Sequence, residues 1–370
     1  MNQIKNLFIN IILILASLIL LLVFLEFIVF RFILFPSEFP KLDFVNGVIK
    51  YTPNQTGVFR VKNEVAAKYR VNANGWNSGH DNYTLKKNSD KYRIAVIGDS
   101  YVEAHVLDFD VSLSEKLESK LGNNKFEVYR FGISGAPMSQ YLHMLRNEVM
   151  KYEPDLVIVI LVHNDFDESY EFLQGSYASN FMKLKIENGD VIEEEPKQFV
   201  RPWYSSLRES AIWRYLVFRQ KIPIDYIKDI LLGNKIYYQG NISITAINAK
   251  KTSNEIVTNY VFSEMKELCD NNNAELLIVM GGVTEVVYGM VDKVESVKAG
   301  ALSLNLIAKE AARQNGIDFL DLEPVFEDYY KQKQKRLTFI HDGHWNEFGH
   351  EIAANAIYEY MNKQDTFEKK

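Results

Sequence analysis

The segment 156–162 reads LVIVILV and contains no polar residue. A strand of this composition must be covered on both faces, which is typical of the strands of a parallel sheet. Four other segments have strand character, and they alternate along the chain with helical patterns. These segments are YRIAVIG (92–98), FEVYRFG (126–132), AELLIVM (274–280) and IDFLDL (317–322). The alternation predicts a flavodoxin-like, three-layer α/β/α sandwich around a mostly parallel, five-stranded sheet.

The helical patterns lie between and after these strands. The first covers residues 111–122 and ends at Gly122, a residue type that commonly terminates helices. The others cover residues 140–152, 254–269 and 300–316, and a last helix begins at Asn346. We therefore expect one large domain over residues 92–363.

The alternation is interrupted at about residues 166–250. FMKLKIENGDVIEEE predicts a hairpin that turns at Asn188-Gly189, because this dipeptide favours two-residue hairpin turns. SSLRESAIWRYLVFRQK predicts a helix, because it places apolar side chains at helical spacing: Leu207, Ala211, Tyr215 and Phe218. We interpret this part as an insertion that covers the functional site or faces a partner.

The N-terminal segment 1–35 is apolar enough to cross a membrane. Between Ile11 and Leu25 only Ser17 is polar, and a transmembrane helix needs roughly 20 apolar residues. The following FRFILFPSEFP contains no small-x-small cleavage site, so we expect an uncleaved single-pass anchor rather than a signal peptide. Residues 36–91 carry turn signals between short alternating pieces, which predicts an irregular, β-rich connecting segment.

Composition excludes some classes of protein. The net charge is −6 and no basic block is present, which argues against a nucleic-acid partner. The single cysteine, Cys269, excludes an internal disulfide and a thiolate-rich zinc site.

Polar or backbone-permissive residues follow the strands. In open α/β sheets the functional site lies at the carboxyl ends of the strands. Each residue alone is a weak signal, since a serine at such a place is commonly a helix N-cap. Together they stand at successive strand ends: Ser100 after the first strand, Gly135 after the second, His163 and Asn164 after the third, and Asp342, His344 and His350 near the last helix.

These residues could supply the groups that acyl transfer through a serine requires. Ser100 can act as the nucleophile, His344 as its base, and Asp342 as the acid that holds the imidazole tautomer. The backbone N–H groups of Ser100 and Gly135 and the side-chain amide of Asn164 can donate to the developing oxyanion. Such a mechanism needs no cofactor and no metal.

On these blocks the chain resembles the SGNH (GDSL-type) hydrolases. The matching blocks lie between Tyr92 and about Lys363, apart from the insertion, and read VIGDSYVEA, RFGISGAP, LVHNDF and DGHWNEFGH. The resemblance implies the SGNH hydrolase fold and a serine esterase that forms an acyl-enzyme on Ser100. YRVNANGWNS and the acidic Glu26 in the apolar segment are similar to a membrane-anchored bacterial subgroup. That subgroup implies an O-acylated cell-envelope glycan or similar ester as substrate and a domain outside the cytoplasm.

The sequence departs from the family pattern at two positions. The acid commonly lies three residues before the histidine, where this chain has His341, whereas Asp342 lies two before. The third block reads HND instead of GND, which places His163 beside the expected oxyanion site. We expect neither His341 nor His350 to be essential.

The charge pattern and the resemblance favour opposite orientations of the anchor. Lys5 precedes the apolar segment, and Arg31, Lys41 and Lys50 follow it, so the positive-inside rule favours a cytoplasmic domain. The resemblance to envelope enzymes favours an extracytoplasmic domain, which is the orientation we predict.

Three other functions are compatible with the sequence. An O-acyltransferase of cell-surface polysaccharide would form the same acyl-enzyme, and a membrane acyl-donor protein would be its partner. A non-catalytic scaffold would keep the fold without the reaction. A metallophosphoesterase would use aspartate, asparagine and histidine ligands. Such enzymes carry D-x-H at their first strand, however, whereas here D-x-H comes last.

Overall fold

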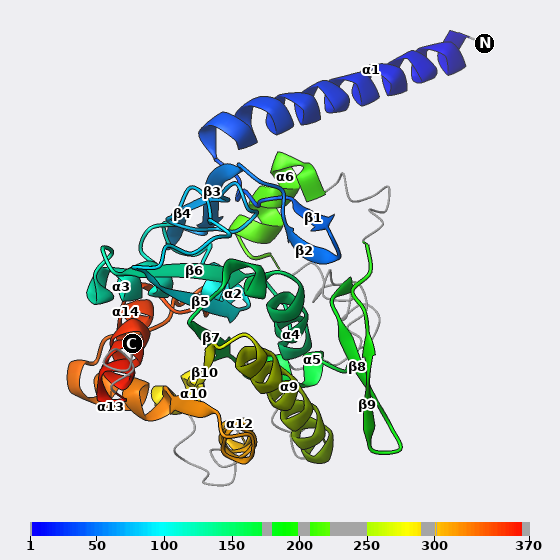
Figure 1. Cartoon of the computed structure of the whole chain (residues 1–370). Coiled ribbons are helices and arrows are strands. Elements are labelled where there is room, and N and C mark those ends of the chain that lie inside the picture. Colours follow the sequence, from blue (N-terminus) through cyan, green and yellow to red (C-terminus); the bar gives the residue numbers. More distant parts are fainter. Residues whose placement is uncertain are drawn as a thin grey trace. The chain divides into compact units, whose positions relative to one another are not determined.

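Five parallel strands form one sheet at the centre of the fold (Figure 1). The computed structural model describes residues 2–171, 180–198, 208–222, 250–289, 300 and 302–364. The strands follow the spatial order β11-β10-β7-β5-β6, and every neighbouring pair is parallel. Their bounds are Tyr92–Gly98 (β5), Phe126–Gly132 (β6), Leu156–Leu161 (β7), Glu275–Met280 (β10) and Asp318–Asp321 (β11). The five predicted strands and the parallel sheet are confirmed.

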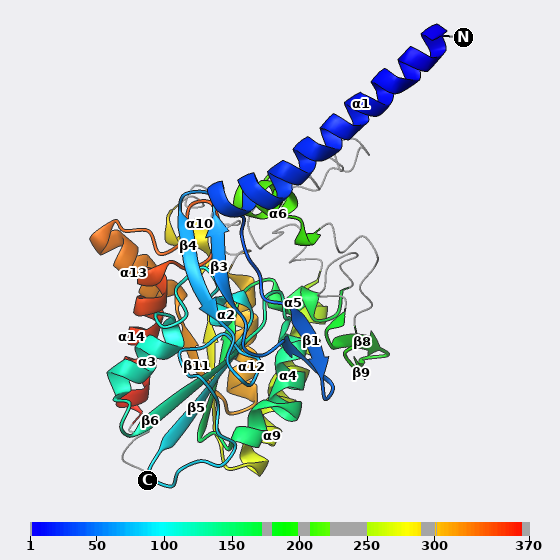
Figure 2. The ribbon, with the colours of Figure 1, turned by 90° about the horizontal axis from the view of Figure 1, so that it is seen from above.

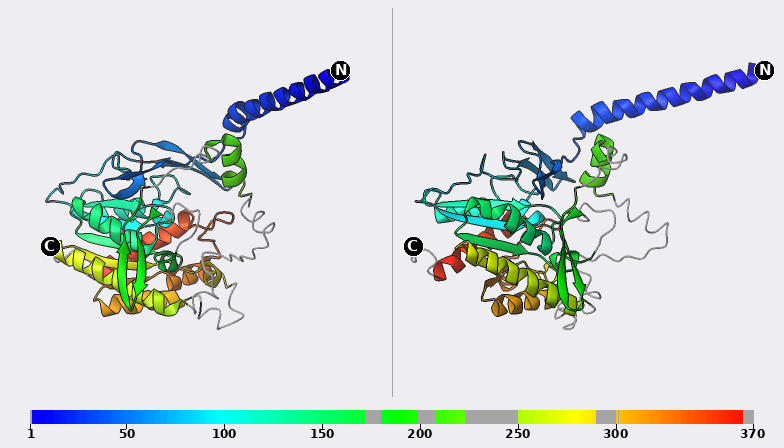
Figure 3. Two further views of the ribbon diagram at one scale, coloured as in Figure 1. Left: turned by 90° about the vertical axis from the view of Figure 1, so that its right-hand side faces the viewer. Right: turned by 45° about the vertical axis from the view of Figure 1, so that its right-hand side comes forward.

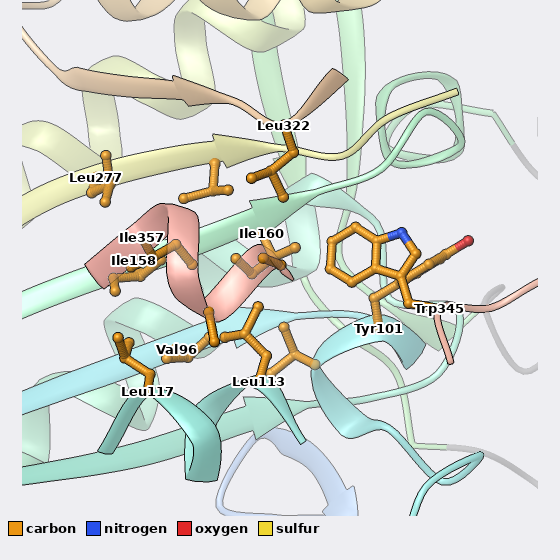
Figure 4. Packing of buried hydrophobic residues seen from close by; sticks show 14 of the residues in the cluster. Val96, Tyr101, Leu113, Leu117, Ile158, Ile160, Leu277, Leu322, Trp345 and Ile357 are labelled. Carbon is orange, nitrogen blue, oxygen red and sulfur yellow. The ribbon is translucent and has the colours of Figure 1, made fainter. Parts of the chain in front are cut away.

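Helices cover both faces of this sheet, which confirms the three-layer arrangement (Figure 2). One face carries α3 (Leu113–Leu121), α13 (Glu323–Lys333) and α14 (Glu347–Lys363), and the other carries α4 (Met138–Asn147), α9 (Lys251–Asn271) and α12 (Ser303–Gln314). Figure 4 shows the core on the first face, where Val96, Ile158 and Leu277 from three strands meet Leu117 and Ile357 from two helices.

Two helices differ from the expectation. The helix predicted over residues 140–152 ends at Asn147, and a short 3₁₀ turn, Val149–Tyr152, follows it. Helix α13 was not predicted, because its sequence EPVFEDYYKQK is polar and buries few side chains. The last helix begins as expected: the Asn346 side chain caps it by accepting from the N–H groups of Phe348 and Gly349.

The hairpin predicted in the insertion forms as β8 (Lys183–Glu187) and β9 (Asp190–Glu194). Its turn residues Asn188 and Gly189 both have positive φ, 54° and 93°, as a two-residue hairpin turn of this sequence requires. The hairpin stands beside α9 (Figure 3), and the Glu193 carboxylate accepts hydrogen bonds from Arg146 and Tyr260. Leu207 of the predicted helical stripe lies outside the described residues.

Short strands occupy the segment between the N-terminal helix and the sheet. β1 (Leu42–Val45) pairs with β2 (Val48–Tyr51), and β3 (Thr56–Val61) pairs with β4 (Val65–Arg70). Residues 36–91 thus contain two separate two-stranded sheets.

The chain divides into two compact units of interleaved segments. The second unit (residues 40–57, 67–199 and 237–370) contains the five-stranded sheet, and the first comprises residues 1–39, 58–66 and 200–236. In the first unit, α1 (Asn2–Phe24) continues as a π-helical segment, η1 (Leu25–Ile33), and α6 (Ala211–Trp213) continues as a second one, η5 (Arg214–Arg219). The helix from Ile4 to Ile33 is long and apolar enough to cross a membrane.

Candidate active site

Ser100 stands at the sharp turn between the first strand of the sheet, β5, and the short helix α2 (Ser100–Glu103). The preceding Asp99 caps this helix, because its side chain accepts the N–H of Tyr101 at 2.9 Å. Gly98 is required at the end of the strand, since a Cβ there would lie 2.4 Å from a methyl group of Val102. The turn leaves Ser100 half-buried at the carboxyl end of the sheet.

The imidazole of His344 lies against this serine. His344 Nε2 is 2.8 Å from the Ser100 hydroxyl, and His344 Nδ1 is hydrogen-bonded to the Asp342 carboxylate. The Asp342 side chain is 2% exposed, whereas that of His344 is 28% exposed. The acid is therefore shielded from water while the imidazole faces both the serine and the open side of the site.

A closed loop holds Asp342 and His344 in place. Its ends meet in a β-bridge between Thr338 and Trp345, and the Phe339 N–H donates to the His344 carbonyl at 2.9 Å. The ring of Tyr101 lies 4.9 Å from the His344 ring and 4.9 Å from the Trp345 ring, centroid to centroid. Figure 4 shows Tyr101 and Trp345 together at the edge of the core. These contacts explain how D-x-H spacing orients the imidazole.

Asp99 is a second carboxyl beside Ser100. The Ser100 hydroxyl can also donate to Asp99 Oδ2, at 3.3 Å. Burial raises the pKa of the Asp99 carboxyl, and the hydrogen bond from the Tyr101 N–H partly opposes this shift. The shorter contact to His344 makes the imidazole the better placed acceptor for the serine proton.

The order of the strands places the Ser100 strand, β5, between the strands that lead to Gly135 and Asn164. Gly135 follows β6 with φ +69°, a conformation that side chains disfavour. Glu103 holds the preceding residue: its carboxylate accepts the Ser134 N–H at 3.2 Å and also the Ser134 hydroxyl. Gly132 lets α2 approach β6, since a Cβ there would lie 2.1 Å from the Glu103 nitrogen.

Asn164 follows β7, and its side-chain amide is already oriented. Its Nδ2 donates to Glu168 at 3.1 Å, while its buried Oδ1 has no hydrogen-bond partner among the described residues. Burial raises the pKa of Glu168 to about 7, partly opposed by the hydrogen bond from Asn164. An amide with one N–H bound to Glu168 keeps its second N–H for another acceptor.

Of the other histidines considered in the sequence analysis, His163 and His350 have partners of their own. His163 is buried, and its Nε2 lies 2.8 Å from the Asn305 side chain on α12, so it packs under the strand ends. The Nδ1 of His350, which is fully buried, accepts the N–H of Leu113 at 3.1 Å. His341 is exposed. Burial lowers the pKa of His163 to about 4 and that of His350 to about 3.

Two acidic residues near the site were not singled out in the sequence. Glu103 supports the Gly135 loop, and Glu168 binds the Asn164 amide. The sequence signal that could have identified them is their spacing: Glu103 lies three residues after Ser100, and Glu168 lies four after Asn164. This spacing puts each on the short helix that follows its strand. Among the residues that the structure describes, no group of three or more histidine, cysteine, aspartate or glutamate side chains is arranged to hold a metal ion.

The fold is similar to those of solved ester hydrolases. No protein-family model and no curated protein matches the sequence. An acetyl xylan esterase is 14% identical, with a TM-score of 0.41, over 72% of this chain and 98% of that one. A GDSL-like lipase from Bacteroides thetaiotaomicron is also 14% identical, with a TM-score of 0.38, over 76% and 92%. A lipase from the goat rumen metagenome is 12% identical, with a TM-score of 0.40, over 73% and 97%. The residues of the site, rather than these similarities, carry the functional proposal.

Proposed function

We propose that the chain is a membrane-anchored serine esterase of the SGNH type that forms an acyl-enzyme on Ser100. The 2.8 Å contact between Ser100 and His344, with Asp342 behind the imidazole, carries this proposal. A hydroxyl bonded to an imidazole, which is bonded in turn to a shielded carboxylate, is the arrangement that nucleophilic acyl transfer uses.

The reaction proceeds in two half-reactions. Ser100 Oγ attacks the ester carbonyl while its proton passes to His344 Nε2, and Asp342 stabilises the imidazolium that forms. The alkoxide leaving group takes that proton and departs as the alcohol, which leaves the acyl group on Ser100. A water molecule then attacks the acyl carbonyl, gives its proton to His344, and releases the acid as Ser100 regains a proton.

Donors at the strand ends stabilise the oxyanion of both steps. The Ser100 and Gly135 N–H groups and the Asn164 amide are the proposed donors, and removing one such donor typically costs about 10²–10³ in kcat. The substrate is an O-acyl ester, and a cell-envelope glycan is the proposed carrier of the acyl group.

The N-terminal helix serves as an uncleaved anchor in this proposal. Residues beyond its apolar part bind other segments of the first unit: the carbonyls of Leu34 and Phe35 accept from Arg219, and that of Ser37 accepts from Arg214. Cleavage near residue 35 would remove the Leu34 and Phe35 carbonyls from the half-buried guanidinium group of Arg219, which supports a retained helix. Intact-mass measurement of the protein from the membrane fraction tests whether residues 1–35 remain.

The nucleophile is tested by trapping with a fluorophosphonate probe and mapping the modified residue. Label on Ser100 in the wild type, absent in Ser100→Ala and retained in the exposed Ser89→Ala, is the expected result. A wild-type chain that hydrolyses esters without labelling at Ser100 would contradict the mechanism. Supplying a sugar acceptor during turnover separates the two outcomes of the acyl-enzyme, since an acyltransferase would give acylated sugar in place of free acid.

A further inference from the structure

The described part of the first unit beyond residue 25 consists of the end of the apolar helix, the residues that follow it, and two segments hydrogen-bonded to them. We call this set of segments the collar: residues 26–39, 58–66 and 208–222. The collar holds Glu26, an acidic residue that directly follows an apolar stretch and is therefore a candidate for a dedicated role.

The depth of Glu26 follows from the length of the helix before it. Residues 4–25 are 22 residues, and at about 1.5 Å per residue they span about 33 Å. The hydrocarbon core of a bilayer is about 30 Å thick. In a helix that spans the bilayer, Glu26 consequently lies at the boundary between hydrocarbon and headgroups.

Three hydrogen bonds bring the insertion to this depth. The Glu26 carboxylate accepts the Ser210 hydroxyl at 2.8 Å, the Ala211 N–H at 2.7 Å and the Ile212 N–H at 3.0 Å. Glu26 thus occupies the N-terminus of the helical segment 211–219, a position that stabilises a negative charge. Because these bonds are short, the start of segment 211–219 lies at the same depth in the bilayer as Glu26.

Aromatic contacts fix the same segment along the end of the anchor. The rings of Phe30 and Tyr215 are 5.1 Å apart, and those of Phe39 and Phe218 are 4.7 Å apart, centroid to centroid. Other large apolar side chains of the collar remain exposed: Phe32 by 70%, Phe35 by 47% and Ile222 by 38%. Exposed apolar groups beside aromatic and arginine side chains are typical of protein at a membrane interface.

The charge of the collar is opposite to that of the whole chain. It has seven basic residues, Arg31, Arg60, Lys62, Arg208, Arg214, Arg219 and Lys221, and four acidic ones, Glu26, Glu38, Glu64 and Glu209, a net charge of +3 by subtraction. The chain as a whole has −6. Clustered basic residues at a bilayer surface attract anionic phospholipids.

We propose that the collar is a membrane-surface binding element that Glu26 assembles and that takes the phosphate headgroups of anionic phospholipids. This inference rests on the proposed anchor, because the depth of Glu26 is counted along a spanning helix. It makes the insertion a second membrane contact, separate from the helix that crosses the bilayer.

A depth measurement in nanodiscs tests the proposal on the full chain. In a Cys269→Ala background, an environment-sensitive fluorophore is attached at Ile12→Cys or at Ile222→Cys. Nitroxides deep in the acyl chains should quench the label at residue 12, and nitroxides on the headgroups should quench the label at residue 222. Adding phosphatidylglycerol to phosphatidylcholine should increase headgroup quenching at residue 222 alone.

The Glu26→Gln variant separates the role of the carboxylate from that of the anchor. It should reduce headgroup quenching at residue 222 at least twofold and leave deep quenching at residue 12 unchanged, while Glu310→Gln, an equal charge change on a surface helix, should alter neither. Circular dichroism confirms that each variant is folded. A label at residue 222 open to aqueous quenchers, with residue 12 deep in the bilayer, would overturn the collar alone. Residue 12 outside the bilayer would overturn the anchor and the collar with it.

Discussion

The Ser100 hydroxyl and the His344 imidazole lie 2.8 Å apart although 244 residues separate them in the chain. The sheet brings Ser100 to the end of β5, and the loop closed by Thr338 and Trp345 carries His344 to the same edge. Asp342 lies on that loop as well, so the histidine and its acid are positioned relative to each other by local structure.

Substitution of the proposed base, His344, should abolish turnover. For His344→Ala we expect kcat to fall by roughly 10⁴–10⁶, because Ser100 loses its proton acceptor. For Asp342→Asn we expect kcat to fall by about 10⁴, because the tautomer of the imidazole is no longer fixed. The exposed His341→Ala is the matched control and should stay within about tenfold, or about 1.4 kcal/mol. EDTA should not inhibit. An inactive His341→Ala beside an active His344→Ala would show that the wrong histidine was assigned.

His350 should matter for stability rather than for chemistry. Its removal leaves the buried Leu113 N–H without an acceptor, so His350→Ala should lower the free energy of unfolding by about 1–3 kcal/mol. Turnover per folded molecule should stay within about tenfold of wild type. Urea unfolding measures the first quantity, and active-site titration of the folded fraction gives the second.

Acid should destabilise the fold through the same residue. Burial holds the pKa of His350 at about 3 in the folded chain, below the ordinary value of about 6.5. Below pH ~6.5 the unfolded chain therefore binds more protons than the folded chain. The contribution of the neutral His350 to the free energy of unfolding is intact above that pH and declines as the pH falls toward 3. Between pH ~6.5 and ~5 the loss is about 2 kcal/mol. Urea unfolding of wild type and of His350→Gln, which does not titrate, should show that difference in pH dependence.

Glu168 should act through Asn164. Asn164→Ala should lower kcat by about 10²–10³ through loss of a proposed oxyanion donor. Glu168→Ala should lower it about tenfold, because the Asn164 amide loses the acceptor that orients it. The double variant should be no slower than Asn164→Ala, since Glu168 has no other route to the reaction. Glu171→Ala, which removes an acid paired with Lys250, serves as the control. Additive losses would exclude the coupling.

The insertion should influence which esters are accepted. Deleting residues 185–198 removes most of the β8-β9 hairpin but leaves Lys183, whose ammonium group donates to the Glu168 carbonyl. We expect turnover of short-chain p-nitrophenyl esters to survive and the preference among larger esters to change. Unchanged rates and unchanged preference for every ester would refute a role in substrate access.

The orientation of the anchor can be tested by cysteine accessibility. Lys86 and Lys197 are exposed, whereas Lys87 is engaged with Asp155, so the first two are suitable positions. In a Cys269→Ala background, Lys86→Cys and Lys197→Cys should react with an impermeant thiol reagent in intact cells. Protection of both until lysis would place the domain in the cytoplasm, as the positive-inside rule favours.

The strands were predictable because burial on both faces leaves a strong sequence signal, as in LVIVILV. Helix α13 escaped prediction because few of its side chains are buried, and the break after Asn147 escaped because α4 and the following turn share one apolar pattern. The residues at the strand ends could be proposed from their order alone. The bond from Asn164 to Glu168 could not, because it depends on side-chain orientation within a loop, where periodicity gives no information.

The position of the closed loop after all five strands of the sheet sets the order in which the site is completed during biosynthesis. Ser100 and its strand emerge from the ribosome long before Asp342 and His344, which follow Ser100 by 242 and 244 positions in the chain. Until α14 packs against α3, the serine has no imidazole to take its proton. Under the proposed mechanism the chain stays latent while the sheet forms, and reactivity arises only when the loop and helix α14 have folded into place.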